Sequence, residues 1–403
     1  MTGKAKLSFL KKWLWRKITS AYDWLLYALH VYPSAEISEE VIVFACDNTR
    51  LEIGKYAYCL HQKYQTKIVL MMPKTRVGNF LKGNEFHKVF IFRNSWHLLR
   101  ILKSAERYIE LIHYFGRAST SGYKILTKTD FPFIFSGKDL SVMYEGLDTQ
   151  KNVFKNDLKF EKYCLAHANG VISESLEIQP ARRIYQIPKV PSLFFPIYTD
   201  NRFFITPEKK SLKEIHWVYI GGVHPKSASP ELGTMKLHWL IDACEKNRIF
   251  FHIYPNHGLH PSIYREYFSL AEKNQYFTMH KPVEPEKISQ EISRYHFGII
   301  PFFDEDTTRL PLKRRYCTSN KLFNYIEAGL PVLISEDMQF QLFLARKMRA
   351  GISMKKNDFI NFQEKRKAID YEKTVNELLK QRETYCLENQ IGRMYYFYNK
   401  IKK

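Results

Sequence analysis

Residues 319–335 constrain what this chain can fold into more than any other stretch of its sequence. Ser319 is a residue type that caps helix N-termini, and the apolar residues after it recur at helical spacing. Gly329 suits the left-handed position after a helix, and Pro331 prevents the helix from continuing. The apolar run Val332–Ile334 is typical of a buried strand in a parallel sheet. The stretch therefore predicts a loop, a helix and a strand, which together form one unit of an α/β protein.

A helix that begins in a loop of an α/β sheet presents free N–H groups and the positive end of its dipole. These groups attract phosphates, and Lys321 adds a positive charge in the first turn. The stretch is therefore a candidate phosphate site. The alternative is an ordinary loop–helix–strand unit without a ligand, and the local pattern leaves both open.

The first half of the chain predicts a doubly wound parallel sheet. An apolar strand at Glu40–Cys46 leads through the loop Asp47–Arg50 into a helix at about Ile53–Tyr64 and a strand at Lys67–Met72. This order is a βαβ unit. A further helix is expected at about Asn156–Ala168. Further strands are expected at Lys88–Phe92, Tyr108–Tyr114, Phe133–Ser136, Gly170–Ser173 and Arg183–Gln186.

The second half repeats this order after a linker at about 188–207. A strand at Glu214–Ile220 runs into Gly221 and Gly222, where a ligand can approach the backbone closely. A plain tight turn is the alternative for these glycines. A chain of 403 residues exceeds one ordinary core, so two α/β domains with a cleft between them are expected. The expected units are a basic N-terminal helix at 1–35, a first domain at 36–205, a second domain at 206–370 and a helical segment at 371–403. Further helices are expected at Thr234–Lys246 and Glu284–Ser293, and further strands at Ile249–Tyr254 and Phe297–Pro301.

The charge of the chain favours an anionic partner. Sixty-two Lys and Arg residues against 41 Asp and Glu residues give a formal net charge of +21. Phosphorylated substrates, an anionic membrane surface or nucleic acid would each suit this charge, and a Lys-rich solvated surface is the alternative. We do not expect nucleic acid, because no RNP, KH or helix-turn-helix pattern occurs.

The N-terminal residues 4–31 alternate basic and aromatic side chains, including Trp13, Trp15 and Trp24. Their apolar residues recur at helical spacing, and tryptophans beside lysines are typical of helices that lie on anionic membranes. We therefore expect an amphipathic helix on the cytoplasmic face of a membrane, in a peripheral and cytoplasmic protein. The alternative is a helix docked on the protein's own core. The pairs Lys11-Lys12 and Arg16-Lys17 interrupt any signal-peptide core.

Several chemistries have no support in the sequence. The six cysteines lack a CxxC pair and are expected to be reduced core residues. No apolar run reaches the roughly 18 residues of a membrane span. GxSxG, HExxH, Walker A and GxGxxG motifs are absent. The acidic run Asp304–Asp306 is interpreted as a loop, so no metal or other cofactor is expected.

Four segments resemble the motifs of GT-B nucleotide-sugar glycosyltransferases, and of the GT4-like group in particular. Residues 319–332, SNKLFNYIEAGLPV, resemble the signature S-x-K-L-x-E-Y-x-A-x-G-x-P-V. Residues 161–175 resemble the segment E-x(6)-A-D-x-V-I-x-x-S late in the family's first domain. Residues 217–222 resemble the first strand and glycine turn of its second domain, and residues 295–301 resemble its A-D-x-x-x-x-P strand. The resemblance implies two Rossmann-like α/β/α domains that face each other across a cleft, with the C-terminal helix packing back on the first domain.

The resemblance implies a donor site in the second domain. Ser319, Asn320 and Lys321 would lie over the donor diphosphate, with Gly221 and Gly222 opposite. The chain departs from the pattern at two positions: Asn324 stands where the family usually has the Glu that binds the ribose, and Tyr316 stands where its partner Glu contacts the sugar. Asn accepts hydrogen bonds more weakly than a carboxylate does. The preceding Lys313, Arg314 and Arg315 are candidates to neutralise the diphosphate, in place of a metal, or else belong to a solvated loop.

A base for the acceptor hydroxyl is expected from the first domain. Asp139 and His113 are the predicted catalytic residues, and Asp47 and Glu145 are weaker candidates; each is also compatible with a purely structural role. Asp47, Arg50 and Gly54 are expected to border the acceptor.

These inferences predict a glycosyltransferase that moves a sugar from a nucleotide-diphosphate donor to a lipid-linked or cell-envelope glycan, in polysaccharide biosynthesis. A GT-B protein without catalysis that binds a glycan or a protein partner is the first alternative, and a basic nucleic-acid-binding protein is a weaker one. A sugar-nucleotide epimerase would share the same donor site. The sequence leaves the sugar, the base, the acceptor and the stereochemistry open.

Overall fold

The fold is known from a computed structural model. It describes residues 18–19, 21–29, 36–48, 50–74, 85–116, 120–144, 152–228, 235–256, 264–306 and 311–402.

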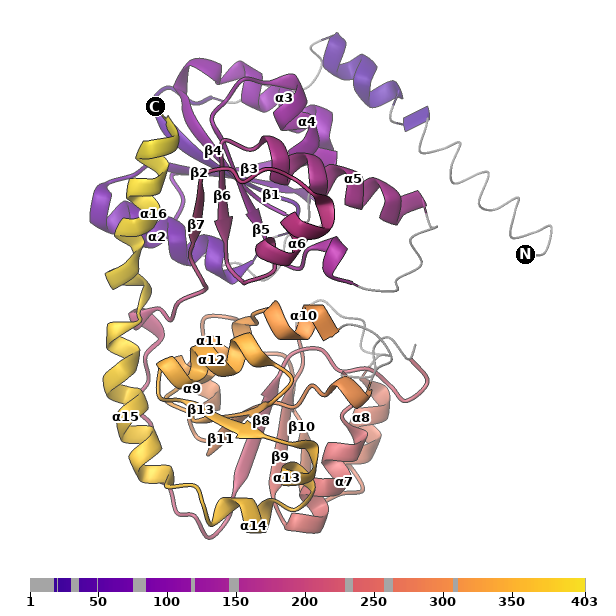
Figure 1. The fold of residues 1–403 in the computed structure, drawn as a ribbon, viewed down its shortest axis with the longest axis vertical. Coiled ribbons are helices and arrows are strands. Elements are labelled where there is room, and N and C mark those ends of the chain that lie inside the picture. Colours follow the sequence, from indigo (N-terminus) through magenta and orange to yellow (C-terminus); the bar gives the residue numbers. More distant parts are fainter. Residues whose placement is uncertain are drawn as a thin grey trace, which may run out of the picture.

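The first domain is built on a parallel sheet of seven strands in the order β3-β2-β1-β4-β5-β6-β7 (Figure 1). Strand β1 is buried along its whole length, as expected for a sheet covered on both faces. Its side chains alternate: Val41, Val43 and Ala45 face α3, α4 and α5, whereas Ile42 and Phe44 face α2 and the C-terminal helix α16 (Leu387–Lys402). The elements are β1 (Val41–Cys46), α2 (Leu51–Tyr64), β2 (Ile68–Pro73), β3 (Lys88–Phe92), α3 (Ser95–Ser104), β4 (Ile109–Phe115), α4 (Thr120–Lys128), β5 (Phe133–Gly137), α5 (Asn152–His167), β6 (Gly170–Ser173), α6 (Ile178–Tyr185) and β7 (Ser192–Phe194).

The second domain repeats the plan with six parallel strands in the order β10-β9-β8-β11-β12-β13. Alternation along β8 again separates two cores: Trp217 and Tyr219 face α7, and Val218 and Ile220 face α11 and α12. The elements are β8 (His216–Ile220), α7 (His238–Asn247), β9 (Phe250–Tyr254), α8 (Arg265–Ala271), β10 (Phe277–Met279), α9 (Ile288–Ile292), β11 (Phe297–Ile300), α10 (Pro311–Tyr316), α11 (Asn320–Glu327), β12 (Val332–Ser335), α12 (Gln339–Lys347), β13 (Gly351–Met354), α13 (Lys356–Ile360) and α14 (Phe362–Arg366).

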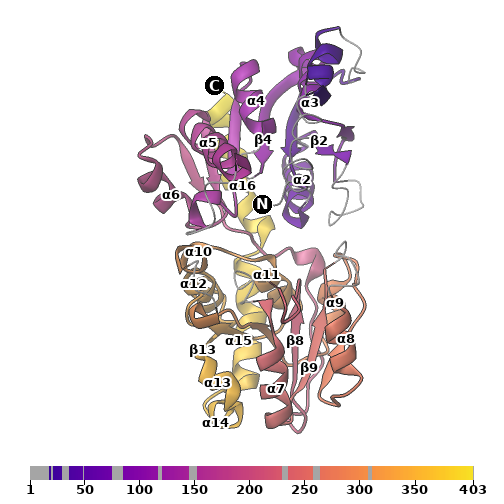
Figure 2. The same ribbon diagram turned by 90° about the vertical axis from the view of Figure 1, so that its right-hand side faces the viewer.

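Two C-terminal helices connect the domains. Helix α15 (Tyr371–Thr384) runs along the second domain, and α16 (Leu387–Lys402) continues beside the first, as Figures 1 and 2 show. In α16, residues 387, 391, 394 and 398 lie at helical spacing and are buried against the first domain together with α2. This arrangement confirms the prediction that the C-terminal helix packs back on the first domain.

One predicted element is wrong. The expected strand Arg183–Gln186 is the end of α6, which closes with Gln186 in the left-handed conformation at φ 53°. The edge strand is instead β7, inside the expected linker. A run of four residues is too short to distinguish the side-chain period of a strand, 2, from that of a helix, about 3.6. Ile178 and Ala181, three positions apart, pack in the core of the first domain and hold α6 against it.

The N-terminal residues 18–19 and 21–28 are helical. Tyr27 packs on Trp96 of α3, with ring centroids 5.2 Å apart. Nothing in the described part of the chain forms a helix long and apolar enough to cross a membrane. The rest of the predicted N-terminal helix lies outside the described residues.

Candidate active site

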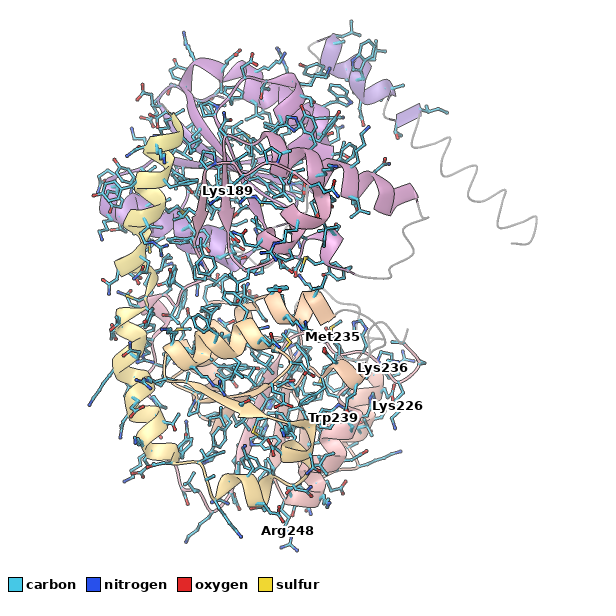
Figure 3. All side chains as sticks on the ribbon, in the orientation of Figure 1. Lys189, Lys226, Met235, Lys236, Trp239 and Arg248 are labelled. Atoms are coloured by element: carbon cyan, nitrogen blue, oxygen red, sulfur yellow. The ribbon has the colours of Figure 1, made fainter. Side chains whose placement is uncertain are left out.

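The two sheets direct their carboxyl ends toward each other across a cleft. In each sheet the strand order reverses beside one central strand, β1 in the first and β8 in the second, and ligands bind outside such switch points. A cleft of about 620 Å³ lies between the domains. Arg50 and Asp139 line it from the first domain, and Gly221 and Lys321 line it from the second. Met235, which is labelled in Figure 3, also lines it from the second domain.

Helix α11 is fixed on its sheet by Tyr325. The Tyr325 hydroxyl accepts the N–H of Ile220 at 3.1 Å and donates to the carbonyl of Ile299 at 3.2 Å, so it joins β8 to β11 at the switch point. The ring lies on Gly298, where any larger side chain would overlap it. At the start of the helix, the Ser319 hydroxyl accepts the N–H of Lys321 at 3.3 Å. The predicted cap is confirmed, and the helix N-terminus opens into the cleft.

Lys321 points from this N-terminus across Gly221. Gly221 has φ +131°, and a Cβ there would lie 2.6 Å from Cε of Lys321, so this position requires glycine. No described carboxylate forms an ion pair with the Lys321 ammonium, which lies 5.3 Å from the centre of the Tyr219 ring. Burial, together with the charge of Lys138, lowers the pKa of Lys321 to about 8. Lys321 is therefore a cation available to an anionic ligand.

Asn320 joins the two domains. Its amide nitrogen donates to Glu52 at 3.0 Å, and its amide oxygen accepts from Lys138 at 3.0 Å. Lys138 also pairs with Glu52 at 3.2 Å, and Arg50 pairs with Glu52 at 3.3 Å. Burial opposes ionisation of Glu52, but Lys138 and Arg50 outweigh it and lower its pKa to about 2. Arg50 also pairs with the buried Glu174 at 3.1 Å.

Asp139 stands on the opposite wall of the cleft, in a left-handed conformation at φ 57°. Its backbone N–H donates to Glu177 at 3.0 Å, and its carboxylate lies 2.5 Å from Nζ of Lys313. Glu161 supports the next turn by accepting the N–H groups of Ser141 and Val142 at 2.6 and 3.1 Å. Glu161 is the first residue of the segment 161–175, which resembles a family motif, and these hydrogen bonds give it a structural role in the turn after Asp139.

A second cavity of about 580 Å³ adjoins the cleft on the side of the first domain. It lies at the carboxyl ends of β1 and β4, with Asp47 and Gly116 in its wall. Polar side chains predominate there, which suits a hydroxyl-rich ligand. The two cavities share Asn48, Arg50, Lys138 and Asp139.

The structure brings most of the predicted residues together. Asp47, Arg50, Asp139, Gly221, Ser319, Asn320, Lys321 and Asn324 all line one cavity or both.

His113 does not lie in the cleft, and its predicted role as a base is wrong. It is fully buried in the core of the first domain, where its Nδ1 lies 2.6 Å from the Tyr398 hydroxyl of α16. Burial lowers its pKa well below the usual value. The residue therefore fixes α16 to β4 and cannot reach an acceptor.

Four other predicted residues lie away from both cavities. Gly54 is buried within α2, and the Gly222 carbonyl accepts the Tyr219 hydroxyl at 2.9 Å. Arg315 is exposed on α10. The Tyr316 ring packs on the core of the first domain, and its carbonyl accepts the Leu176 N–H at 3.1 Å. The turn of α10 rotates residues 315 and 316 away from the cleft while it directs Lys313 into it.

Sequence reasoning missed Lys138, Glu52, Glu174 and Glu177. Glu174 directly follows β6 and Glu177 lies in the same loop before α6, so the rule that drew attention to Asp47 after β1 could have found them. Lys138 directly follows β5 and carries the same signal. Glu52 lies in the first turn of α2 and carries none, because Lys138 and Asn320, which it contacts, come from distant parts of the chain.

The acidic run Asp304–Asp306, which was predicted to be a loop, forms a short 3₁₀ helix. Asp304 pairs with Arg314, and Glu305 pairs with Lys356 at 2.9 Å. Within the described ranges, no three His, Cys, Asp or Glu side chains are grouped to bind a metal ion. The six cysteines are free thiols. Glu145 lies outside the described residues.

No protein-family model matches the chain, and no curated protein matches it in sequence. Solved structures do resemble it. Sucrose-phosphate synthase from Thermosynechococcus elongatus superposes with a TM-score of 0.66 at 13% identity, over 90% of this chain and 99% of that one. HepE from Anabaena, in complex with UDP-glucose, gives 0.61 at 12% identity over 89% and 100%.

A putative UDP-N-acetylglucosamine 2-epimerase from Listeria monocytogenes gives a TM-score of 0.53 at 9% identity, over 89% of this chain and 95% of that one. Identities this low show the fold and leave the activity open. Two parallel α/β domains, a cleft between their switch points and a returning C-terminal helix agree with these neighbours, and the chain has the GT-B fold.

Proposed function

We propose that the protein is a glycosyltransferase that uses a nucleotide-diphosphate sugar. One observation carries the proposal: the N-terminus of α11 and the Lys321 ammonium, which pairs with no described carboxylate, face the partly exposed carboxylate of Asp139 across one cleft. The first is a site for a diphosphate, and the second is a base for a hydroxyl. The known complexes of HepE with UDP-glucose and UDP support a nucleotide sugar as the ligand.

The reaction breaks the bond between the anomeric carbon and the diphosphate and forms a bond to the acceptor oxygen. Negative charge grows on the departing diphosphate, and the N–H groups of α11 with Lys321 lie where they would stabilise it. The proton of the acceptor hydroxyl passes to Asp139. The polar cavity next to Asp139 is the proposed acceptor site, with Asp47 and Arg50 in its wall.

We further propose an acceptor at a membrane surface, either a lipid-linked or a cell-envelope glycan. Residues 18, 22, 25 and 29 lie at helical spacing on one stripe of the N-terminal segment, and these side chains are 45–62% exposed. The helix therefore contacts the protein through Tyr27 and turns this apolar stripe outward. The basic residues before it favour an anionic lipid surface as the partner.

A GT-B subunit that binds a donor or glycan without catalysis is the second candidate. Asn324 favours it, because this residue lines the cleft as a neutral amide at the position where the family has a carboxylate. Binding without turnover of any donor in the presence of candidate acceptors would support this candidate.

Calorimetric titration of UDP-, GDP-, ADP-, dTDP- and CMP-sugars tests the donor site. We expect one of the diphosphate donors to bind, and CMP-sugars, which have a single phosphate, to bind more weakly. Lys321→Ala should weaken the affinity for the tightest-binding donor at least tenfold, because a charge-assisted contact contributes about 1.5–3 kcal/mol. Absence of binding by every donor would contradict the proposal.

A further inference from the structure

Lys313 lies where the two domains meet, and its ammonium contacts two carboxylates of the first domain. Helix α10 of the second domain carries it, and its side chain is 10% exposed. Nζ lies 2.5 Å from Oδ1 of Asp139 and also contacts Glu177. The carboxylates differ in environment: the side chain of Glu177 is 0% exposed and that of Asp139 is 44% exposed.

Glu177 is a fixed anchor. It accepts the Ser175 hydroxyl and the backbone N–H of Asp139, both at 3.0 Å. A buried carboxylate with these donors would be costly to leave without a cation. Lys313 is therefore expected to keep its contact with Glu177 when its contact with Asp139 changes.

The first-domain cations near Asp139 have their own carboxylates. Arg50 pairs with Glu174, and Lys138 pairs with Glu52. Lys313 is thus the cation best placed to respond to a change in the charge of Asp139.

Lys313 also lines the same cleft as Ser319 and Lys321. A diphosphate at the N-terminus of α11 would bring two or more negative charges into this cleft. Such a ligand competes with Asp139 for Lys313, because an ammonium is a point charge that can turn between acceptors.

We propose that Lys313 couples donor binding to activation of the acceptor. It pairs with Asp139 before a nucleoside diphosphate binds, and it then turns to the diphosphate while it stays on Glu177. The Asp139 carboxylate gives up its contact with Lys313 and accepts the proton of the acceptor hydroxyl as the glycosidic bond forms and the nucleoside diphosphate leaves. Donor binding before acceptor binding is the consequence. This inference rests on the proposed function.

A double-mutant cycle with UDP as the probe tests the coupling. The dissociation constant is measured by calorimetry for the wild type, Lys313→Met, Asp139→Asn and the double variant. We expect Lys313→Met to weaken UDP binding about tenfold, because a charge-assisted contact is lost. Asp139→Asn should tighten UDP binding about fivefold, because Asp139 no longer competes with UDP for the Lys313 ammonium. The double variant should match Lys313→Met within about twofold.

Two outcomes would overturn the inference. In the first, Asp139→Asn tightens UDP equally in the Lys313→Met background, which would show simple repulsion between Asp139 and the ligand. In the second, Lys313→Met leaves UDP binding unchanged. Lys380→Gln, which removes an exposed charge from α15, is the control for net charge. Lys313→Gln replaces Lys313→Met if the latter does not fold.

The cycle also separates this inference from the proposed function. A wild-type protein that binds neither UDP nor GDP, ADP, CDP or dTDP would contradict both. Binding with an additive cycle would contradict the coupling alone.

Discussion

Lys321 has a charge that changes near physiological pH, because burial and the neighbouring Lys138 lower its pKa to about 8. A bound diphosphate stabilises the ammonium form and raises this pKa again. Nucleotide binding must therefore take up a proton above pH 8. The terminal phosphate of UDP is already ionised there, since its pKa is about 6. We expect UDP affinity to fall by up to about tenfold per pH unit above pH 8, measured by calorimetry in buffers of different ionisation enthalpy.

Lys321→Arg is the matched control. An arginine stays protonated at every pH used, so its UDP affinity should lose this dependence even if its absolute value changes. A wild-type affinity that is flat between pH 7 and 9, or an equal slope in Lys321→Arg, would show that Lys321 does not contact the ligand.

The sequence motif around Asn324 predicted part of the local structure but not the neighbours of this side chain. The sequence located the helix, its cap and the missing carboxylate. It could not show that Glu327, one turn later, is fully buried with one oxygen 3.4 Å from the Asn324 amide nitrogen. A glutamate at 324 would place a second carboxylate beside a buried one. The cation that pairs with Glu327 is Lys55, which is 272 residues away from it in sequence.

Elements were predictable where burial made their pattern long and regular. The strands β1, β5, β11 and β12 are apolar on both faces, and their positions follow from the sequence. Helix α6 was misread because only one side of a short segment is buried. The orientation of the described N-terminal residues 21–28 could not be predicted, because it depends on the contact between Tyr27 and Trp96.

The orientation of the N-terminal helix makes its membrane role testable. Tyr22 and Leu25 are 59% and 45% exposed on the outward stripe. We expect the protein to sediment with vesicles that contain phosphatidylglycerol and, much less, with vesicles of phosphatidylcholine alone. Tyr22→Ser/Leu25→Ser should reduce the sedimented fraction, with an affinity at least tenfold weaker, because each buried apolar side chain contributes about 1.5 kcal/mol or more.

The control for this variant removes similar side chains elsewhere. Tyr396 and Ile184 are 69% and 49% exposed on other helices, so Tyr396→Ser/Ile184→Ser should leave vesicle binding unchanged. Equal losses in the two double variants would mean that the stripe has no special role. Binding that persists above 0.5 M salt would mean that the basic residues contribute little.

The whole molecule is assembled by contacts that no local pattern reveals. The switch points of the two sheets predict where the cleft lies. The pairs that close it join residues far apart in sequence: Lys313 and Asp139 are separated by 174 positions, and Asn320 and Glu52 by 268. Such pairs form only once both domains have folded, so they were absent from the sequence prediction.

The buried pair of Lys55 and Glu327 joins α2 of the first domain to α11 of the second, at 2.5 Å. Glu327 also accepts the backbone N–H of Asp200 at 2.9 Å and the Ser289 hydroxyl at 3.3 Å. The carboxylate therefore lies where both domains and the segment between them meet.

Removing one member of this pair should destabilise the protein more than removing both. Lys55→Met leaves the Glu327 carboxylate buried without a cation, which we expect to cost about 3–5 kcal/mol of unfolding free energy in urea. Lys55→Met/Glu327→Gln should recover most of this loss, because a neutral amide still accepts the Asp200 N–H and no unpaired charge remains. If the double variant loses the sum of the two single variants, then the two side chains act independently.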